Sequence, residues 1–210
     1  MSMALYVPSV IVSALDLDLQ ARSVAAELAN DTQWSISDNR VSGAADGVSQ
    51  QATLAPHPLE VQTLSIEKQE RKHSPVPSIL KVYQFHYDLQ IARVLIIDTQ
   101  ARQVIESKPI NSVHLPLNEA EIAFASQQLA TDENLVETLQ LEQQRRGQVP
   151  FVNISELDVK ASIYEPLDQS HACAMQRCAL MSLFDSTRTV FALEPIVNLQ
   201  RLQLDVLRAR

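Results

Sequence analysis

The chain has 210 residues, of which 46% are hydrophobic and 20% charged, and a formal net charge of −8. This composition is typical of a globular protein with one large domain or two small ones. The acidic balance argues against nucleic acid or an anionic membrane surface as partner. No apolar run approaches the roughly 20 residues of a membrane-spanning helix.

The first 58 residues divide into an apolar helical segment and a polar connection. Residues 1–37 are expected to form an arm and a helix with one apolar face, made of Leu17, Ala21, Val24, Ala25 and Leu28. Residues 38–58 hold two of the three glycines among small polar residues, which indicates a linker or long loop. The apolar start lacks a basic region and a clear cleavage site, so the cytoplasm is the expected compartment, with secretion or a periplasmic location as the alternative.

Strand patterns begin after a polar, weakly patterned segment that ends near Pro77. Residues rich in β-branched and aromatic side chains, often alternating with polar ones, predict strands. The predicted strands are Ile79–Tyr87, Ile91–Ile97, Gln103–Ile110, Leu157–Tyr164, Cys173–Phe184, Thr189–Leu193 and Ile196–Leu207. Strands with one polar and one apolar face predict antiparallel sheets covered by helices on one side, an α+β fold.

Two short helices are predicted back to back within Asn118–Gly147. Asn118 and Glu121 have the spacing of a capping box, and Thr131 or Asp132 can cap a second helix. Gly147 can take the left-handed conformation that ends it. The expected apolar stripes are Ile122, Ala125 and Leu129 in the first helix and Leu135, Val136 and Leu139 in the second. Glu119 and Glu121 fit the favourable charge of a first helical turn better than acid–base catalysis.

Several fragments, in this order, resemble the small N-terminal domains of copper amine oxidases over about residues 56–206. They are His57-Pro58-Leu59, Ala92–Asp98, the helical pair, Arg177–Leu180 and Glu194–Leu199 with Asp205. The resemblance implies a cystatin-like fold, with helices packed on one face of a curved antiparallel sheet. It places that fold in residues 59–210, as one unit or as two small units dividing near residue 112.

The same resemblance implies no amine oxidation. The sequence has no T-x-x-N-Y precursor of the topaquinone cofactor and no three-histidine copper site, so no cofactor and no catalytic residue are expected. Asn198 stands where the family has glycine, and Glu194 where it has histidine. The helix that the family places after His57-Pro58-Leu59 has no convincing stripe in this sequence.

His171, Cys173 and Cys178 are the only cluster of metal-ligating residue types. Structural zinc needs four ligands, and a second pair is missing unless His57 or His114 folds over the cluster. If Cys173–Phe184 is one strand, the two cysteines lie about 17 Å apart, too far for a disulfide. Two free thiols are therefore predicted. A turn near residues 174–176 would instead allow a disulfide or a metal.

Two functions remain open from the sequence. The first is a non-enzymatic module that binds another protein or itself. The second is a small-ligand binder, or a modest enzyme, that uses the concave face of the sheet. In that case the expected lining is Tyr83, Phe85 and Tyr87, with His86 or Arg93 as polar groups.

Overall fold

The computed structural model describes residues 14–34, 56–68, 78–201 and 203–208. The predicted arm before Ala14 and most of the predicted linker lie outside the described residues. The chain divides into two compact units, each described here by itself. The described residues of the first unit fall within Met1–Ser42, Ile66–Tyr83 and Val94–Lys108, and those of the second within Gly43–Ser65, Gln84–Arg93 and Pro109–Arg210.

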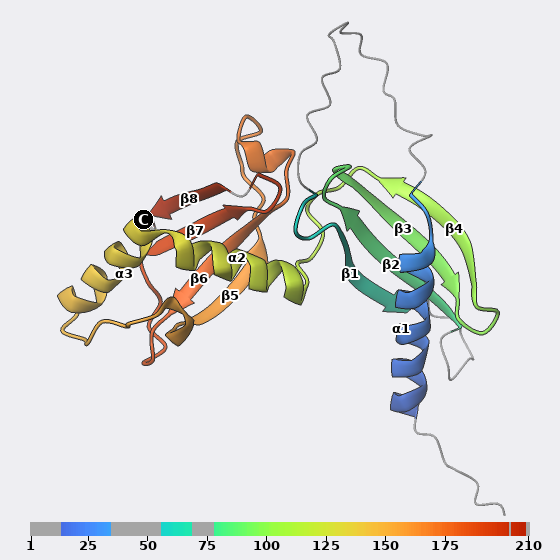
Figure 1. The fold of residues 1–210 in the computed structure, drawn as a ribbon, viewed down its shortest axis with the longest axis horizontal. Helices are drawn as coiled ribbons and strands as arrows, with labels where there is room; N and C mark the ends of the chain where they lie inside the picture. Colours follow the sequence, from blue (N-terminus) through green and yellow to red (C-terminus); the bar gives the residue numbers. More distant parts are fainter. Residues whose placement is uncertain (1–13, 35–55, 69–77, 202, 209–210) are drawn as a thin grey trace, which may run out of the picture. The chain divides into compact units, whose positions relative to one another are not determined.

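A four-stranded antiparallel sheet in the order β1-β2-β3-β4 follows helix α1 in the chain (Figure 1). The elements are α1 (Ala14–Asp31), β1 (Val61–Lys68), β2 (Ile79–His86), β3 (Ile91–Asp98) and β4 (Gln103–Ile110). The prediction missed β1, whose residues are mostly half-buried and whose sequence has no clear alternation. It placed the strands β2, β3 and β4 within one or two residues of their observed ends.

Helix α1 packs on this sheet through alanines. Ala21, Ala25 and Ala29 are buried against Leu80, Val82, Leu95 and Ile97, and Leu28 lies at the edge of the cluster. Three residues of the predicted apolar face, Ala21, Ala25 and Leu28, thus pack on the sheet together with Ala29. The other two, Leu17 and Val24, are half-buried outside this cluster. Small side chains at a spacing of four residues allow the helix to approach the sheet closely.

The β3–β4 hairpin is closed by a turn that Asp98 stabilises. The Asp98 carboxylate accepts hydrogen bonds from the backbone N–H groups of Gln100 and Ala101, both at 2.9 Å. Arg102 ends the turn with φ of +49°. An aspartate that caps its own turn explains why the hairpin forms without the Asn-Gly dipeptide.

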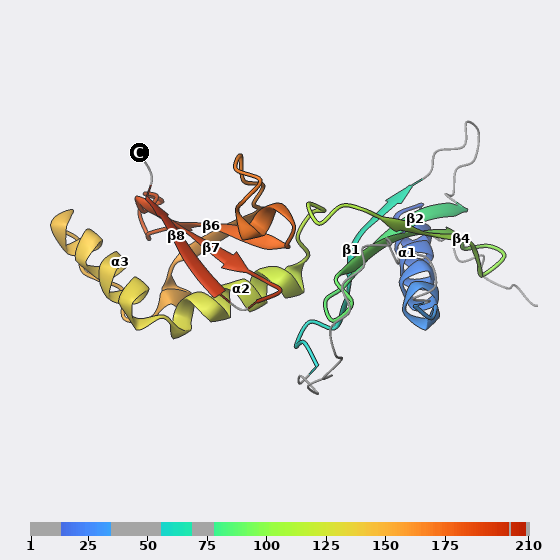
Figure 2. The same ribbon diagram turned by 90° about the horizontal axis from the view of Figure 1, so that it is seen from above.

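The second sheet has the order β5-β6-β7-β8, with every neighbouring pair antiparallel. Its strands are β5 (Asp158–Ile163), β6 (Cys178–Phe184), β7 (Leu193–Asn198) and β8 (Gln203–Arg208). Helices α2 (Glu119–Thr131) and α3 (Glu133–Arg145) precede it, and α2 runs across one face of the sheet (Figure 2). The described part of the chain is thus α+β, and it contains no helix of the length and apolarity that a bilayer crossing requires.

The helical pair forms as predicted. Asn118 and Glu121 make both bonds of the capping box, and Asp132 ends α2 and caps α3. Gly147 has φ of +75° and closes α3 together with the bond from the Gln148 N–H to the Gln143 carbonyl. Ala125, Leu129, Leu135 and Leu139 are buried, as the two stripes require.

The last two predicted strands are wrong in their bounds. Residues 196–207 are broken at Leu199 by a turn, in which the Asn198 side chain accepts hydrogen bonds from the N–H groups of Gln200 and Arg201. Asn198 thus supports this turn through its side chain. Of the predicted strand 189–193, residues 189–192 contribute a single bridge, Phe184 with Val190, and Leu193 is the first residue of β7.

Candidate functional site

Glu121, in the first turn of α2, is a fully buried carboxylate of the second unit. Its side chain is 0% exposed, although a glutamate at this position of a helix is normally solvated. One carboxylate oxygen, Oε2, accepts the Asn118 backbone N–H at 2.9 Å, which completes the capping box. The Asn118 side chain in turn donates to the Gln62 side chain and the Thr63 carbonyl. The helix start is thereby fixed against the residues of β1 that belong to the same unit.

Arg177, directly before β6, neutralises Glu121. The guanidinium donates from Nε to Glu121 Oε1 at 2.6 Å and from Nη2 to Oε2 at 2.9 Å, a bidentate ion pair. Its remaining donors go to the carbonyls of Val113, Leu115 and Pro116 at 2.6 to 2.9 Å. All five N–H groups of a fully buried arginine are therefore used within the chain.

Aromatic rings enclose this ion pair. The Tyr87 hydroxyl donates to Glu121 Oε1 at 2.5 Å, and the guanidinium carbon of Arg177 lies 5.7 Å from the centre of the Phe85 ring. Tyr87 also stacks on His57, with ring centroids 4.5 Å apart. Burial, followed by the negative charge of Glu121, raises the pKa of Tyr87 far above its ordinary value, so the hydroxyl stays a donor at neutral pH.

His57 connects this cluster to the turn after β7. Its Nδ1 accepts the Leu59 N–H at 3.1 Å, so Nε2 carries the proton and donates to the Leu199 carbonyl at 2.7 Å. Glu121, Arg177, Tyr87, Phe85 and His57 together are called the buried cluster below. The hydrogen bonds described above direct the carboxylate and the guanidinium of this cluster to groups of the chain itself. The ion pair is therefore placed to support the fold and not to bind a substrate.

Three of the five side chains predicted to line a concave ligand site are buried, namely Phe85, Tyr87 and Arg93. Phe85 and Tyr87 are 0% and 2% exposed and belong to the buried cluster. Tyr83 is half-buried, and its hydroxyl donates to Glu67 at 3.3 Å. His86 and Arg93 have pKa values lowered by burial, that of Arg93 to about 10, and the Arg93 guanidinium donates twice to the Gln84 side chain.

The prediction of two free thiols is wrong, because Cys173 and Cys178 form a disulfide with Cα atoms 5.6 Å apart. The 17 Å estimate assumed a continuous strand. The chain instead makes a short 3₁₀ helix, η3 (Ala172–Ala174), and turns before β6 begins at Cys178.

The disulfide also removes the candidate metal site. Both sulfurs are bonded to each other, and His171 Nδ1 accepts the Cys173 N–H at 3.1 Å. His114 does fold over this loop, but its Nε2 contacts the Cys173 carbonyl oxygen at 3.1 Å. Within the described ranges no three acidic, histidine or cysteine side chains gather as metal ligands would.

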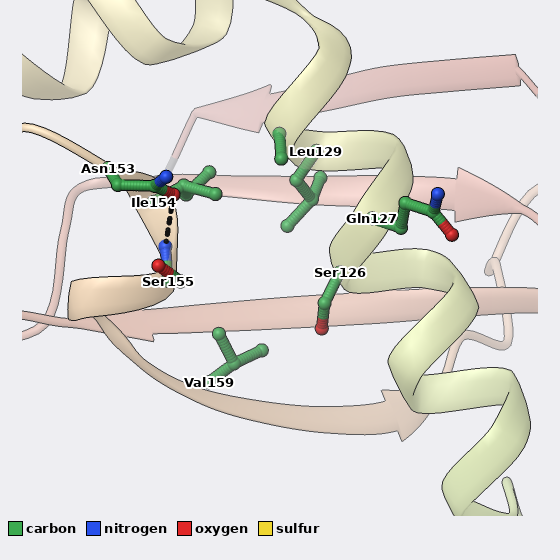
Figure 3. A pocket seen from close by; sticks show the side chains of 8 residues that line it. Ser126, Gln127, Leu129, Asn153, Ile154, Ser155 and Val159 are labelled. Carbon is green, nitrogen blue, oxygen red and sulfur yellow. Dashed lines mark hydrogen bonds between the residues drawn. The ribbon is translucent and has the colours of Figure 1, made fainter.

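One hollow of about 220 Å³ opens between α2, β5 and the 3₁₀ helix η2 (Ile154–Glu156) (Figure 3). Leu129, Ile154 and Val159 supply apolar walls, while Ser126 and Asn153 are the polar neighbours. Asn153 is engaged locally, because its side chain accepts the Ser155 N–H at 3.0 Å. The volume is below the roughly 300 Å³ of small-molecule sites, so the hollow fits a single apolar side chain better than a metabolite.

A second hollow of about 370 Å³ belongs to the first unit. It lies between α1 and the β3–β4 turn and is lined by Leu17, Ala21 and Val24 on the helix and by Thr99, Gln100 and Arg102 on the turn. Arg102 is also paired with Glu27 of α1 at 3.1 Å. The residues that line this hollow include no histidine, cysteine, aspartate or glutamate.

The fold thus defines an α+β protein with two four-stranded antiparallel sheets. No protein-family model matches the sequence. No curated protein sequence matches it either. Among solved structures, the chain is similar to a copper-containing benzylamine oxidase from Hansenula polymorpha, with a TM-score of 0.47 and 12% sequence identity. The match covers 94% of this chain and 29% of the oxidase chain, so this chain spans less than a third of that protein's length.

Proposed function

We propose that this chain is a non-catalytic module that binds another protein or a second copy of itself. Its architecture would be that of the small N-terminal domains of copper amine oxidases, with cystatin-like units. The ordered sequence fragments from His57 to Asp205 support this architecture. So does the arrangement of helix α1 on one face of a four-stranded antiparallel sheet.

The observation that carries the proposal is the saturation of the buried cluster. Glu121 and Arg177 are the groups that a catalytic or anion-binding site would leave open to a ligand. Here the carboxylate takes four hydrogen bonds and the guanidinium gives all five of its donors to the chain itself. This buried ion pair therefore supports the fold and leaves no group open to a ligand, which favours a binding module over an enzyme.

The disulfide favours an oxidising compartment over the cytoplasm that the N-terminal sequence suggested. A disulfide within six residues of chain, with cysteines 1% and 0% exposed, is a structural cross-link. Such cross-links form and persist outside reducing compartments. We therefore propose that the module works in an extracytoplasmic setting, which thiol counting on protein isolated from its native compartment would test.

Native mass spectrometry of the chain isolated from its own cells tests the proposed function. We expect an assembly of defined stoichiometry, made of copies of the chain or of the chain and one other protein. A monomer that carries a stoichiometric small molecule would contradict the proposal and favour the ligand-binding alternative. The same sample after mild unfolding of the assembly identifies the added mass as protein or ligand.

A further inference from the structure

Strand β4 is the outer strand of the first sheet, with β3 as its neighbour in the sheet order. It is exposed on both faces along most of its length, in contrast to β2 and β3, where buried residues predominate. Ile105 is 53% exposed, and the Glu106 and Lys108 side chains are 43% and 63% exposed. Within the described part of the chain, no strand pairs with β4 on its outer side. An outer strand with exposed apolar side chains is a template for pairing with another strand.

The sequence of β4 is complementary to itself when read in reverse. It runs Val104-Ile105-Glu106-Ser107-Lys108-Pro109-Ile110, with two apolar residues at each end, a polar centre and opposite charges on either side of it. In an antiparallel pair of two such strands with Ser107 opposite Ser107, Glu106 faces Lys108. Ile105 then faces Pro109, and Val104 faces Ile110. Directly opposed residues of antiparallel strands share a face and lie close enough to interact.

The side-chain directions agree with this register. Val104 packs at the edge of the cluster under α1, so Glu106, Lys108 and Ile110 point to that same side of the sheet. Glu106 and Lys108 already contact each other within one strand, with the carboxylate oxygen and the ammonium nitrogen 2.6 Å apart. Glu106 and Lys108 therefore lie on the face where Lys108 and Glu106 of a second strand would stand opposite them.

We propose that β4 pairs with β4 of a second copy of this chain, antiparallel and about a two-fold axis at Ser107. The inference rests on the proposed role in association and specifies the partner and the surface. The contact is isologous, because each copy presents the same strand. Pro109 cannot donate a backbone hydrogen bond and Lys108 discourages random pairing, so the edge accepts a strand with a matching charge pattern and rejects others.

Charge reversal on the full chain tests the proposal. Lys108→Glu gives an edge with two negative charges, and Glu106→Lys gives one with two positive charges. Each change turns both cross-strand ion pairs into repulsive pairs, so dimerisation measured by analytical ultracentrifugation should weaken roughly tenfold or more. The exchanged variant, Glu106→Lys with Lys108→Glu, restores the complementary pattern and should dimerise like the wild type.

Mixing the two single variants separates pairing between chains from any effect within one chain. Each single variant has lost the contact between residues 106 and 108 of its own strand, and mixing does not repair that contact. Between chains, however, the two edges are complementary, so an equimolar mixture should form a one-to-one heterodimer. Circular dichroism of each variant confirms that the fold is retained.

Three results would overturn the proposal. A wild-type chain that stays monomeric at hundreds of micromolar would show that β4 does not pair. Single variants that remain as dimeric as the wild type would show that another surface makes the contact, while the proposed function of association would stand. A monomeric wild type with a stoichiometric foreign protein in native isolates would likewise contradict only the self-pairing.

Discussion

Glu121 and Arg177 hold opposite charges fully out of water, and neither has an alternative partner of opposite charge in the bonds described above. Changing Glu121 to alanine leaves the buried guanidinium without its counter-charge, which costs about 3–5 kcal/mol of unfolding free energy. Urea denaturation followed by circular dichroism measures this loss. The matched control is Glu119→Ala, because Glu119 lies in the same helical turn but is exposed, and its loss should stay within about 0.5 kcal/mol. Equal, small losses for both variants would contradict the buried ion pair.

Tyr87 makes the unfolding free energy of the protein depend on pH in the alkaline range. Because burial raises the pKa of its hydroxyl in the folded state, the unfolded chain loses this proton above about pH 10 while the folded chain keeps it. Folding then takes up a proton, and the unfolding free energy falls as the pH rises, by about 1.4 kcal/mol per pH unit from this group.

Tyr87→Phe should remove that contribution. The variant loses one hydrogen bond to Glu121 at neutral pH, about 1.5–3 kcal/mol, but its unfolding free energy should decline less steeply between pH 10 and 11. Urea denaturation at a series of pH values compares the two slopes. Tyr83→Phe is the comparison for a half-buried phenol, whose hydroxyl bonds to Glu67 near the surface. Parallel slopes for wild type and Tyr87→Phe would contradict the assignment.

The buried cluster could not be predicted from the sequence, for reasons visible in its residues. Glu121 satisfies the local pattern of a capping box, and that pattern explains it fully without burial. Its other partners, Tyr87 and Arg177, are 34 and 56 residues away. Arg177 directly precedes Cys178 in a segment whose sequence pattern predicts one continuous strand. Nothing local therefore indicates that the Arg177 side chain is buried.

At the scale of elements, those with local signals were predicted and those set by tertiary contacts were not. The caps at Asn118, Asp132 and Gly147 lie within a few residues of the groups they satisfy, so the helical pair is determined locally. Strand β1 has no such signal, because it becomes a strand through pairing with β2. The cysteine segment failed for a different reason: apolar residues in a short 3₁₀ turn look the same in sequence as residues of a buried strand.

The loop closed by the disulfide should contribute to the unfolding free energy. Cys173, Cys178 and Ile196 pack together on the second sheet, with Tyr164 and Leu180 beside them. Cross-linking across five residues restricts the unfolded chain, so removing the bond should lower the unfolding free energy by about 2 kcal/mol. The double variant Cys173→Ala, Cys178→Ala measures this loss by urea denaturation.

Reductant provides the control for that measurement. It should destabilise the wild type and leave the double alanine variant unchanged, because the variant has no bond to reduce. Thiol counting on unfolded, unreduced wild-type protein should find no free thiol, and two after reduction. Two thiols before reduction would contradict the disulfide and restore the original sequence prediction.

For the whole molecule, we expect no amine oxidation by the chain. The sequence offers neither the cofactor tyrosine motif nor the copper histidines of the family it resembles. Purified protein supplied with copper and a primary amine should develop no quinone absorbance and release no peroxide. A heat-denatured sample is the baseline, and either signal above that baseline would contradict the non-catalytic role.

The last prediction concerns the part of the chain before Leu54. Helix α1 covers Leu80, Val82, Leu95 and Ile97, all at or near 0% exposure. A chain that starts at Leu54 lacks this helix and exposes those four side chains, each of which contributes about 1.5–3 kcal/mol when buried. Light scattering and binding of an apolar dye should therefore show an aggregating chain.

A second truncation that starts at Ala14 separates the helix from the segment before it. This chain keeps α1 and should fold and associate like the full protein, because the contacts that cover the sheet are made by Ala21, Ala25 and Ala29. If the chain from Leu54 stays monomeric and binds no dye, α1 is dispensable and its packing on the sheet contributes little. If instead the chain from Ala14 becomes monomeric while the full chain is a dimer, the first 13 residues make the contact between copies and β4 does not.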